Sequence, residues 1–114
     1  MTTFFGFALA DSMFSGDCNI RRRKLAAEQV GEKVAQGVES CLNPSHSATI
    51  SAMRSRFGLD VDIPFNPPRV VLGVGDSVIV MGVRGLPRLT DRHEYTNEEV
   101  AKATFEFNEY SVTA

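Results

Sequence analysis

The segment around His46 contains the residue types that phosphate chemistry requires. His46 is surrounded by three hydroxyl residues, Ser45, Ser47 and Thr49, at the expected start of a helix. A helix start exposes unpaired N–H groups and the positive end of the helix dipole, which together favour a bound anion. An imidazole in such a place can donate a proton to a leaving alkoxide. The same pattern also fits a plain helix start, in which Ser45 or Ser47 is the N-cap and His46 has no chemical role.

A second group of candidate residues lies in the charged segment 84–95. Arg84, Arg88 and Arg92 occur there at intervals of four, near a glycine and a proline. Guanidinium groups bind phosphates in a bidentate manner, and loops held by strands often carry binding residues. The segment therefore predicts either a phosphate-binding loop or a solvated surface loop.

The longest basic run is the sequence of three arginines and a lysine at residues 21–24. Such a run could hold a nucleotide phosphate or a nucleic acid backbone, or it could be the solvated start of a helix. The net charge of the whole chain is −2. This acidic balance favours the solvated helix and argues against a protein that coats long nucleic acids.

Length and composition predict one domain over residues 1–114, with room for a single hydrophobic core. The two cysteines, Cys18 and Cys41, have neither metal-ligand spacing nor the density of a secreted scaffold, so we expect reduced, partly buried thiols and no metal. The apolar N-terminus lacks the basic residues of a signal peptide and is too short to span a bilayer. We therefore expect a cytoplasmic protein without membrane association.

The elements that must position these residues can be read from hydrophobic periodicity. The apolar run 3–9 predicts a central strand, and apolar residues at intervals of three and four predict a helix over residues 22–42. A second helix is expected from Ser45 or Ser47 to residue 57, where Gly58 ends it.

The second half of the chain predicts mainly strands. Segments 69–72 and 77–81 are apolar and flank a glycine-rich turn, which is typical of a hairpin. Thr96 and Glu99 have the spacing of a helix capping box, and the alternation over residues 104–112 predicts a strand near a sheet edge. The fold class expected is α/β, with a small mixed sheet of four to five strands and helices packed on it.

Taken together in order, residues 45–112 resemble the viral anti-CRISPR ring nucleases and their bacterial relatives. Those proteins degrade cyclic tetra-adenylate, the second messenger of type III CRISPR defence. The matching features occur in the family's order and spacing: His46-Ser-Ala-Thr49-Ile50, Gly58, Arg69-Val70, Gly75-Asp76, the strand 78–83, Arg88-Leu89 and Glu98-Glu99.

The resemblance implies a role for each matched side chain. His46 would act as general acid and protonate the departing 5′-oxygen after the ribose 2′-hydroxyl attacks its own phosphate. Arg88, or Arg84 by an alternative alignment of the loop, would stabilise charge on the phosphorane, and Asp91 matches an acidic residue of the family. The residues that would contact the ligand are Ser12, Ser45, Ser47, Thr49, Arg69 and Arg84.

The resemblance also implies a homodimer, in which one cyclic oligonucleotide meets two copies of His46, and a reaction without metal or cofactor. A viral member would act in the host cytoplasm. The sequence departs from the family pattern at Ser45, where the family has glycine, and in the opening turn, residues 7–12.

Two functions other than an enzyme remain open from the sequence. A protein with the same site could bind a cyclic nucleotide signal and sequester it without cutting it. Alternatively, an interaction protein could bind a host partner by adding a strand to an exposed edge of the final strand.

Overall fold

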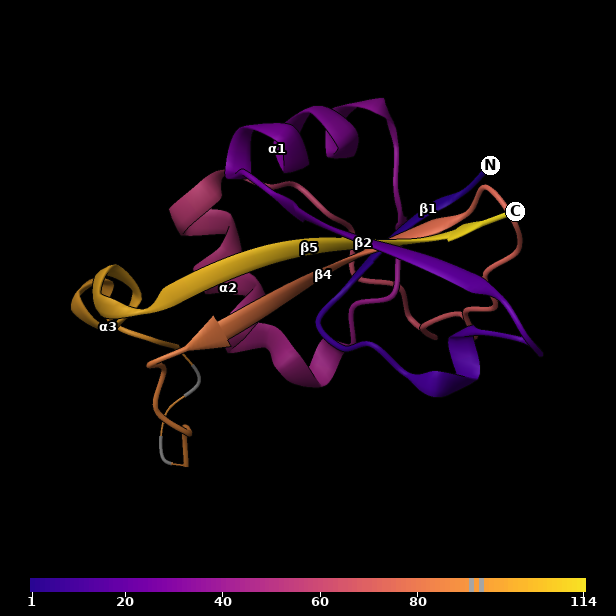
Figure 1. Cartoon of the computed structure of the whole chain (residues 1–114). Coiled ribbons are helices and arrows are strands. Elements are labelled where there is room, and N and C mark those ends of the chain that lie inside the picture. The colour runs from indigo at the N-terminus through magenta and orange to yellow at the C-terminus, as the bar shows by residue number, and fades with distance from the viewer. Residues whose placement is uncertain (91, 93) are drawn as a thin grey trace.

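The computed structural model describes residues 1–90, 92 and 94–114, so Asp91 lies outside the described residues. One five-stranded sheet has the strand order β2-β5-β4-β1-β3 (Figure 1). β1 runs parallel to β3 and to β4, whereas β5 is antiparallel to β4 and to β2. The strands are β1 (Thr3–Gly6), β2 (Asn19–Leu25), β3 (Glu39–Ser40), β4 (Ser77–Arg84) and β5 (Thr104–Thr113).

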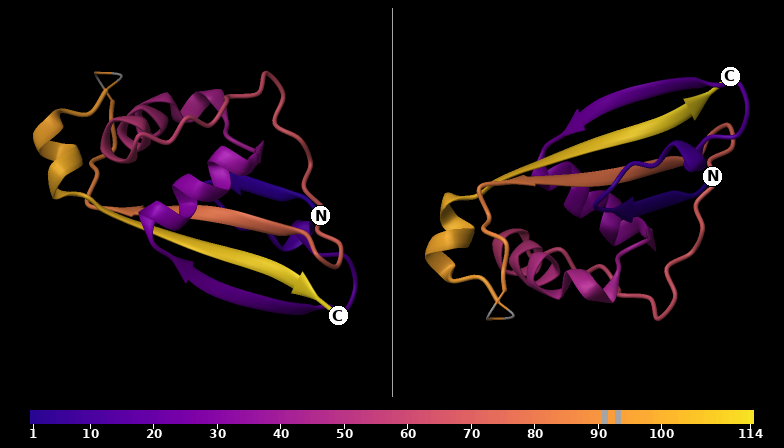
Figure 2. Two further views of the ribbon diagram at one scale, coloured as in Figure 1. Left: turned by 90° about the horizontal axis from the view of Figure 1, so that it is seen from above. Right: turned by 90° about the horizontal axis from the view of Figure 1, so that it is seen from below.

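In the described residues, three α-helices and two short 3₁₀ turns accompany the sheet, and the expected mixed α/β architecture is confirmed. Figure 2 shows α1 and α2 against the strands from two directions. None of the helices in the described part of the chain has the length and apolar character needed to cross a bilayer. The helical elements are η1 (Asp11–Met13), α1 (Ala27–Gln36), η2 (Pro44–His46), α2 (Ser47–Phe57) and α3 (Asn97–Lys102).

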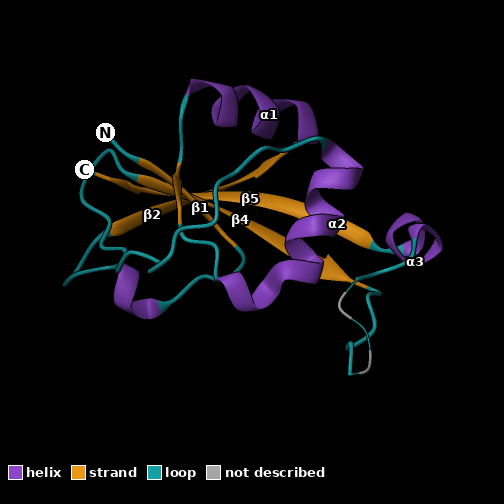
Figure 3. Cartoon of the chain, turned by 180° about the vertical axis from the view of Figure 1, so that it is seen from behind, coloured by secondary structure: helices purple, strands orange, loops and turns teal. Residues whose placement is uncertain are grey.

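The two faces of the sheet are covered in different ways. On one face, Phe5 and Ile79 pack with Val30 of α1 and with Ile50 and Met53 of α2 in one buried cluster. Figure 3 shows α2 in front of the strands on this side. The opposite face is covered by irregular chain, because segments 13–14 and 70–72 pack against β1 and β4 there. Neighbouring side chains of β1 and β4 are therefore buried on opposite faces, which explains their continuous apolar sequence.

The long helix predicted for residues 22–42 is wrong. Its first part is strand β2, which pairs with β5 from Asn19 opposite Thr113 to Leu25 opposite Phe107. α1 occupies only the middle and ends at Gly37, whose φ of 115° favours glycine. The last part forms β3, a short parallel partner of β1. Pairing with distant strands overrides the helical period at both ends, so the basic run 21–24 lies on an edge strand.

The hairpin predicted between segments 69–72 and 77–81 is also wrong. β4 is paired on one side with β1 and on the other with β5, so no edge of β4 is left for residues 69–72. Leu72 instead forms an isolated parallel bridge with Phe14. The interaction hypothesis for the last strand fails for the same reason, because β5 lies between β2 and β4 and offers no free edge.

Other local predictions are confirmed. α2 ends where Gly58 adopts a φ of 64°, the left-handed conformation that glycine tolerates. The capping box is present, since the Glu99 N–H donates to Thr96 Oγ1 and the Thr96 N–H donates to Glu99 Oε1. The first strand is an interior strand as expected, although it ends at Gly6 rather than at residue 9.

The turn at residues 73–76 fastens the N-terminal segment to the sheet. Asp76 accepts one hydrogen bond from the Thr2 N–H at 2.9 Å and another from the Gly73 N–H at 3.0 Å. These N–H groups, that of Thr2 foremost, lower the pKa of the Asp76 carboxyl below its ordinary value. The ionised carboxylate therefore stabilises the folded chain.

We expect Asp76→Ala to lower the urea midpoint of unfolding at pH 7. The folded-state pKa is depressed, so the contribution is complete above the ordinary carboxyl value of about 4 and is lost as pH falls through the folded value. The difference from the unmodified chain should shrink toward roughly pH 3. Asp60→Ala is the control, because Asp60 is exposed and forms no hydrogen bond or ion pair with a described residue. An unchanged midpoint for Asp76→Ala at pH 7 would contradict this role.

Candidate functional site

His46 lies at the junction between a 3₁₀ turn and α2. Asn43 begins this turn, since its Oδ1 accepts the Ser45 N–H at 2.9 Å and its carbonyl accepts the His46 N–H at 2.9 Å. His46 itself occupies the N-cap position of α2, without a side-chain capping bond. The expectation that Ser45 or Ser47 caps the helix is therefore wrong, because Asn43 caps the turn that precedes it.

The His46 ring packs against the carboxyl end of β1. Its centroid lies 6.1 Å from that of Phe7, with the ring planes at 37°. Phe7 in turn makes an edge-on contact with Phe5, which is fully buried. The imidazole is exposed and forms no hydrogen bond or ion pair with a described side chain. Its position is therefore set by aromatic packing, and its nitrogens are open to a ligand.

Three hollows meet at His46, and each takes its name here from one lining residue. The Arg69 hollow has a volume of about 290 Å³, the Arg88 hollow about 490 Å³ and the Met81 hollow about 300 Å³. His46 lines all three. The Arg69 hollow lies where the chain leaves the carboxyl ends of the parallel strands β1 and β3, the edge at which open α/β sheets usually bind ligands.

The Arg69 hollow combines segments that are far apart in the sequence. Residues 6–8 are the last residue of β1 and the two that follow it, residues 41–43 follow β3, and Arg69 comes from the connector before β4. Ser12 also lines this hollow, so two of the predicted ligand residues meet His46 here. Arg69 can attract the anionic group of a ligand. The less polar parts of the same ligand would then contact the chain that follows β1.

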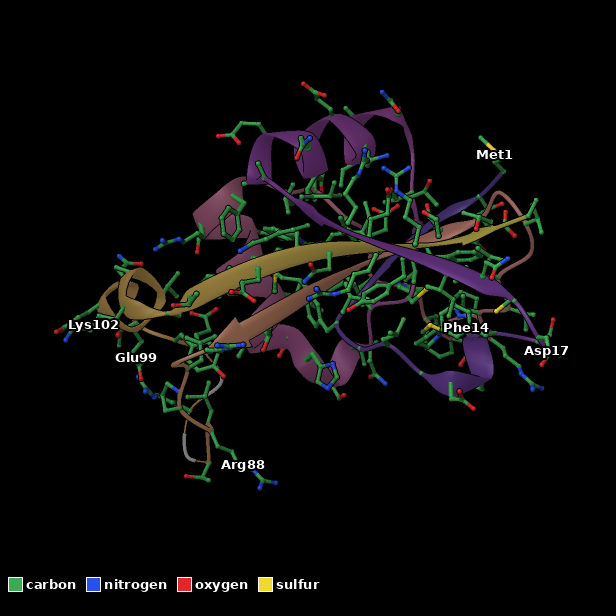
Figure 4. All side chains as sticks on the ribbon, in the orientation of Figure 1. Met1, Phe14, Asp17, Arg88, Glu99 and Lys102 are labelled. Atoms are coloured by element: carbon green, nitrogen blue, oxygen red, sulfur yellow. The ribbon has the colours of Figure 1, made fainter. Side chains whose placement is uncertain are left out.

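The Arg88 hollow collects most of the other predicted residues. Ser45 lines it from η2, Ser47 and Thr49 from the first turn of α2, and Arg88 from the loop after β4. Figure 4 shows Arg88 on the outer part of this loop, with its side chain directed away from the sheet. The hollow therefore combines a helix start, hydroxyl groups and a guanidinium group, all of which can bind a phosphate.

Arg84, the last residue of β4, lines none of the three hollows around His46. Between the two arginines that the sequence left open, the geometry favours Arg88. The prediction for Asp91 falls outside the described residues.

Two further residues line the Arg88 hollow: Arg92, which the sequence had marked as a candidate for phosphate binding, and Tyr95, which it had not. Thr49 also reaches the Met81 hollow beside Phe7. Arg92 pairs with Glu99 at 2.5 Å, and this bond, followed by that from the Thr96 N–H, lowers the pKa of the Glu99 carboxyl. The capping residue of α3 thus also holds one arginine of the hollow. Tyr95 carried no sequence signal beyond its place in the charged loop.

Cys18 and Cys41 are both free, but only Cys41 is partly buried as expected, since Cys18 is exposed. Burial, followed by the nearby Glu39 charge, raises the pKa of the Cys41 thiol, which lines the Arg69 hollow. The thiol is therefore a weak nucleophile there. Within the described residues, no three histidine, cysteine or acidic side chains gather as metal ligands would.

No family model and no curated protein matches the chain in sequence. Among solved structures, the chain is similar to B116 of Sulfolobus turreted icosahedral virus (STIV), with a TM-score of 0.71 and 17% sequence identity. The alignment covers 97% of this chain and 99% of that chain. The chain shares the fold of this viral protein. At 17% identity the likeness shows the fold alone.

Proposed function

We propose that this chain is a metal-independent ring nuclease that opens a cyclic oligoadenylate, with cyclic tetra-adenylate as its preferred ligand, and so counters type III CRISPR signalling. The observation that carries the proposal is the place of His46 at the meeting point of the Arg69 and Arg88 hollows. A phosphate bound in either hollow lies next to the His46 imidazole. The chain shares its fold with a viral protein, which is compatible with this chain being viral and acting in the cytoplasm of a host cell.

The proposed reaction needs one proton donor and one charge partner. The ribose 2′-oxygen forms a bond to the adjacent phosphorus, the bond from phosphorus to the 5′-oxygen breaks, and the product carries a 2′,3′-cyclic phosphate. The 2′-hydroxyl proton passes to solvent, and the His46 imidazolium gives its proton to the departing 5′-oxygen. Arg88 stabilises the extra negative charge on the phosphorane, and the hydroxyls of Ser45, Ser47 and Thr49 orient the phosphate.

The second candidate is a sponge that binds the same ring without cutting it. The exposed imidazole and the arginines would serve binding alone in that case. The two functions differ in the fate of the ligand: a sponge releases the intact ring when the protein is denatured, whereas a ring nuclease releases linear products.

We expect the purified chain to open cyclic tetra-adenylate in EDTA, and His46→Ala to slow opening by roughly 1,000-fold with little change in affinity, because a general acid acts on the transition state. A ring whose leaving 5′-oxygens are replaced by sulfur should restore opening by His46→Ala, since a thiolate leaves without being protonated. Chromatography of the products gives the rates, and calorimetry gives the affinities.

The control for this experiment is Glu32→Ala, which changes an exposed residue of α1 and should leave both rates unchanged. Unaltered opening by His46→Ala would refute the role of His46. Failure of the sulfur-containing ring to restore opening would mean that His46 acts in binding and does not transfer the proton.

The two arginines of the loop should differ in their effect on the reaction. We expect Arg88→Ala to slow opening by about 100-fold, as removal of a charge-stabilising donor does in other enzymes. Arg84→Ala should have a much smaller effect, because Arg84 lines none of the hollows around His46. Single-turnover measurements at saturating protein compare the two variants. A greater loss for Arg84→Ala would reverse the assignment.

The proposal includes a homodimer, because a ring of four nucleotides with two-fold symmetry suits an isologous pair of sites. Titration of the His46→Ala variant with cyclic tetra-adenylate should therefore saturate at about one ring per two chains. Light scattering of the saturated complex should give the mass of two chains. Saturation at one ring per chain, with the mass of a monomer, would contradict the paired site.

A further inference from the structure

The helix-covered face of the sheet becomes polar at the end opposite to His46. The strand register places Thr3 opposite Ser77, Ser77 opposite Ser111, and Ser111 opposite Arg21. These side chains form a row across β1, β4, β5 and β2, which we call the hydroxyl row. Because side chains alternate along a strand, the row faces the same side as the buried Ile79, two positions after Ser77.

The next row toward the core contains a buried carboxylate. Glu109 is 7% exposed, and Ser77 is 8% exposed; they are the buried polar side chains of the described residues. Glu109 Oε1 pairs with Arg23 Nη2 at 3.2 Å, and Oε2 pairs with Lys33 Nζ of α1 at 3.1 Å. Both carboxylate oxygens are thus engaged by cations, and Arg21 is left as an additional positive charge.

A hollow of about 150 Å³ opens between these groups, lined by Arg21, Arg23, Glu109, Ser111 and Thr113. Arg21 is exposed and forms no ion pair with a described residue, and the hydroxyls of Ser111 and Thr113 donate no hydrogen bond to one. Counting Lys33, which contacts Glu109, three positive charges face one negative charge. The hollow is therefore cationic and offers free hydrogen-bond donors of two kinds.

An edge strand often carries charged residues because they prevent pairing with another chain. This explains why β2 is basic, but it applies equally to Arg22 and Lys24, which alternation places on the opposite face. It does not explain why the neighbouring strands place Ser77 and Ser111 in line with Arg21. A guanidinium group can instead bind an oxyanion in a bidentate manner, and the Ser111 hydroxyl next to Arg21 can donate a further hydrogen bond to it.

We propose that this hollow binds a phosphate group, with the Arg21 guanidinium donating two hydrogen bonds and the hydroxyls of Ser111 and Thr113 donating to the other oxygens. Arg23 remains paired with Glu109 and contributes charge. The ligand is inorganic phosphate or a small phosphate monoester, which share this chemistry. The hollow is lined by residues of β2 and β5, and none of them lines a hollow around His46, so the two sites are separate.

The test is a titration of the ¹⁵N-labelled chain with inorganic phosphate at constant ionic strength, followed by NMR. The expected result is a saturable shift of the signals of Arg21, Ser111 and Thr113. Arg21→Gln should weaken binding by about tenfold, because it removes a charged bidentate donor. Lys24→Gln is the matched control: it removes one positive charge from the same strand on the other face and should bind phosphate like the unmodified chain.

Phenyl phosphate in a parallel titration distinguishes a monoester from the free ion: tighter binding of either compound at the same signals supports the site and identifies its ligand. Equal weakening by Arg21→Gln and Lys24→Gln would overturn the proposal, because it would indicate general charge attraction. Shifts that do not saturate, or that occur only at α2 and the loop after β4, would overturn it as well. Unfolding midpoints of both variants confirm that the compared chains are folded.

Discussion

The parallel pairing of β1 between β3 and β4 is the constraint on which the rest of the structure depends. Phe4 and Phe5 are buried on opposite faces of this strand, so β1 is stable only in the interior of a sheet that is covered on both sides. Parallel neighbours must be joined by crossovers, and these crossovers bring α1, α2 and the chain before β4 onto the sheet. Loss of the β1 pairing would separate the side chains packed on one face of the sheet from those packed on the other.

The same pairing explains why the candidate site contains residues from four parts of the chain. Since β1, β3 and β4 run in one direction, the segments that follow them emerge at one edge of the sheet. The chain after β3 leads directly through Asn43 into the turn that holds His46. Phe7, just after β1, provides the surface on which the imidazole rests. The site is therefore supported by the strands, although its polar groups lie on loops and at a helix start.

The two ends of the sheet carry chemically different surfaces. At the carboxyl ends of the parallel strands, an imidazole lies between two hollows that also contain arginines. At the opposite end, beyond the cover of α1, a row of hydroxyls runs to Arg21 on the edge strand. Between them, the buried Glu109 joins β5 to β2 and to α1 through two ion pairs. Breaking one of these pairs would leave one oxygen of the buried Glu109 carboxylate without its cation, which is destabilising.

The amino-acid sequence by itself determined the features that depend on neighbouring residues. α2 with its terminal Gly58, the capping box of Thr96 and Glu99, and the alternation of β5 all follow from local hydrogen bonding and local periodicity. The same local patterns indicated His46 and its three hydroxyl neighbours as one group, and they lie together at one hollow.

Only the tertiary structure decided which segments pair. Residues 21–24 form a strand because β5 offers a partner along its full length, and residues 69–72 do not pair with β4 because β1 and β5 already occupy both of its edges. Likewise, Arg69 and Ser12 meet His46 only through the parallel arrangement of the strands. Strand pairing is a contact between distant residues, so its outcome depends on every competing partner, and no local pattern records that competition.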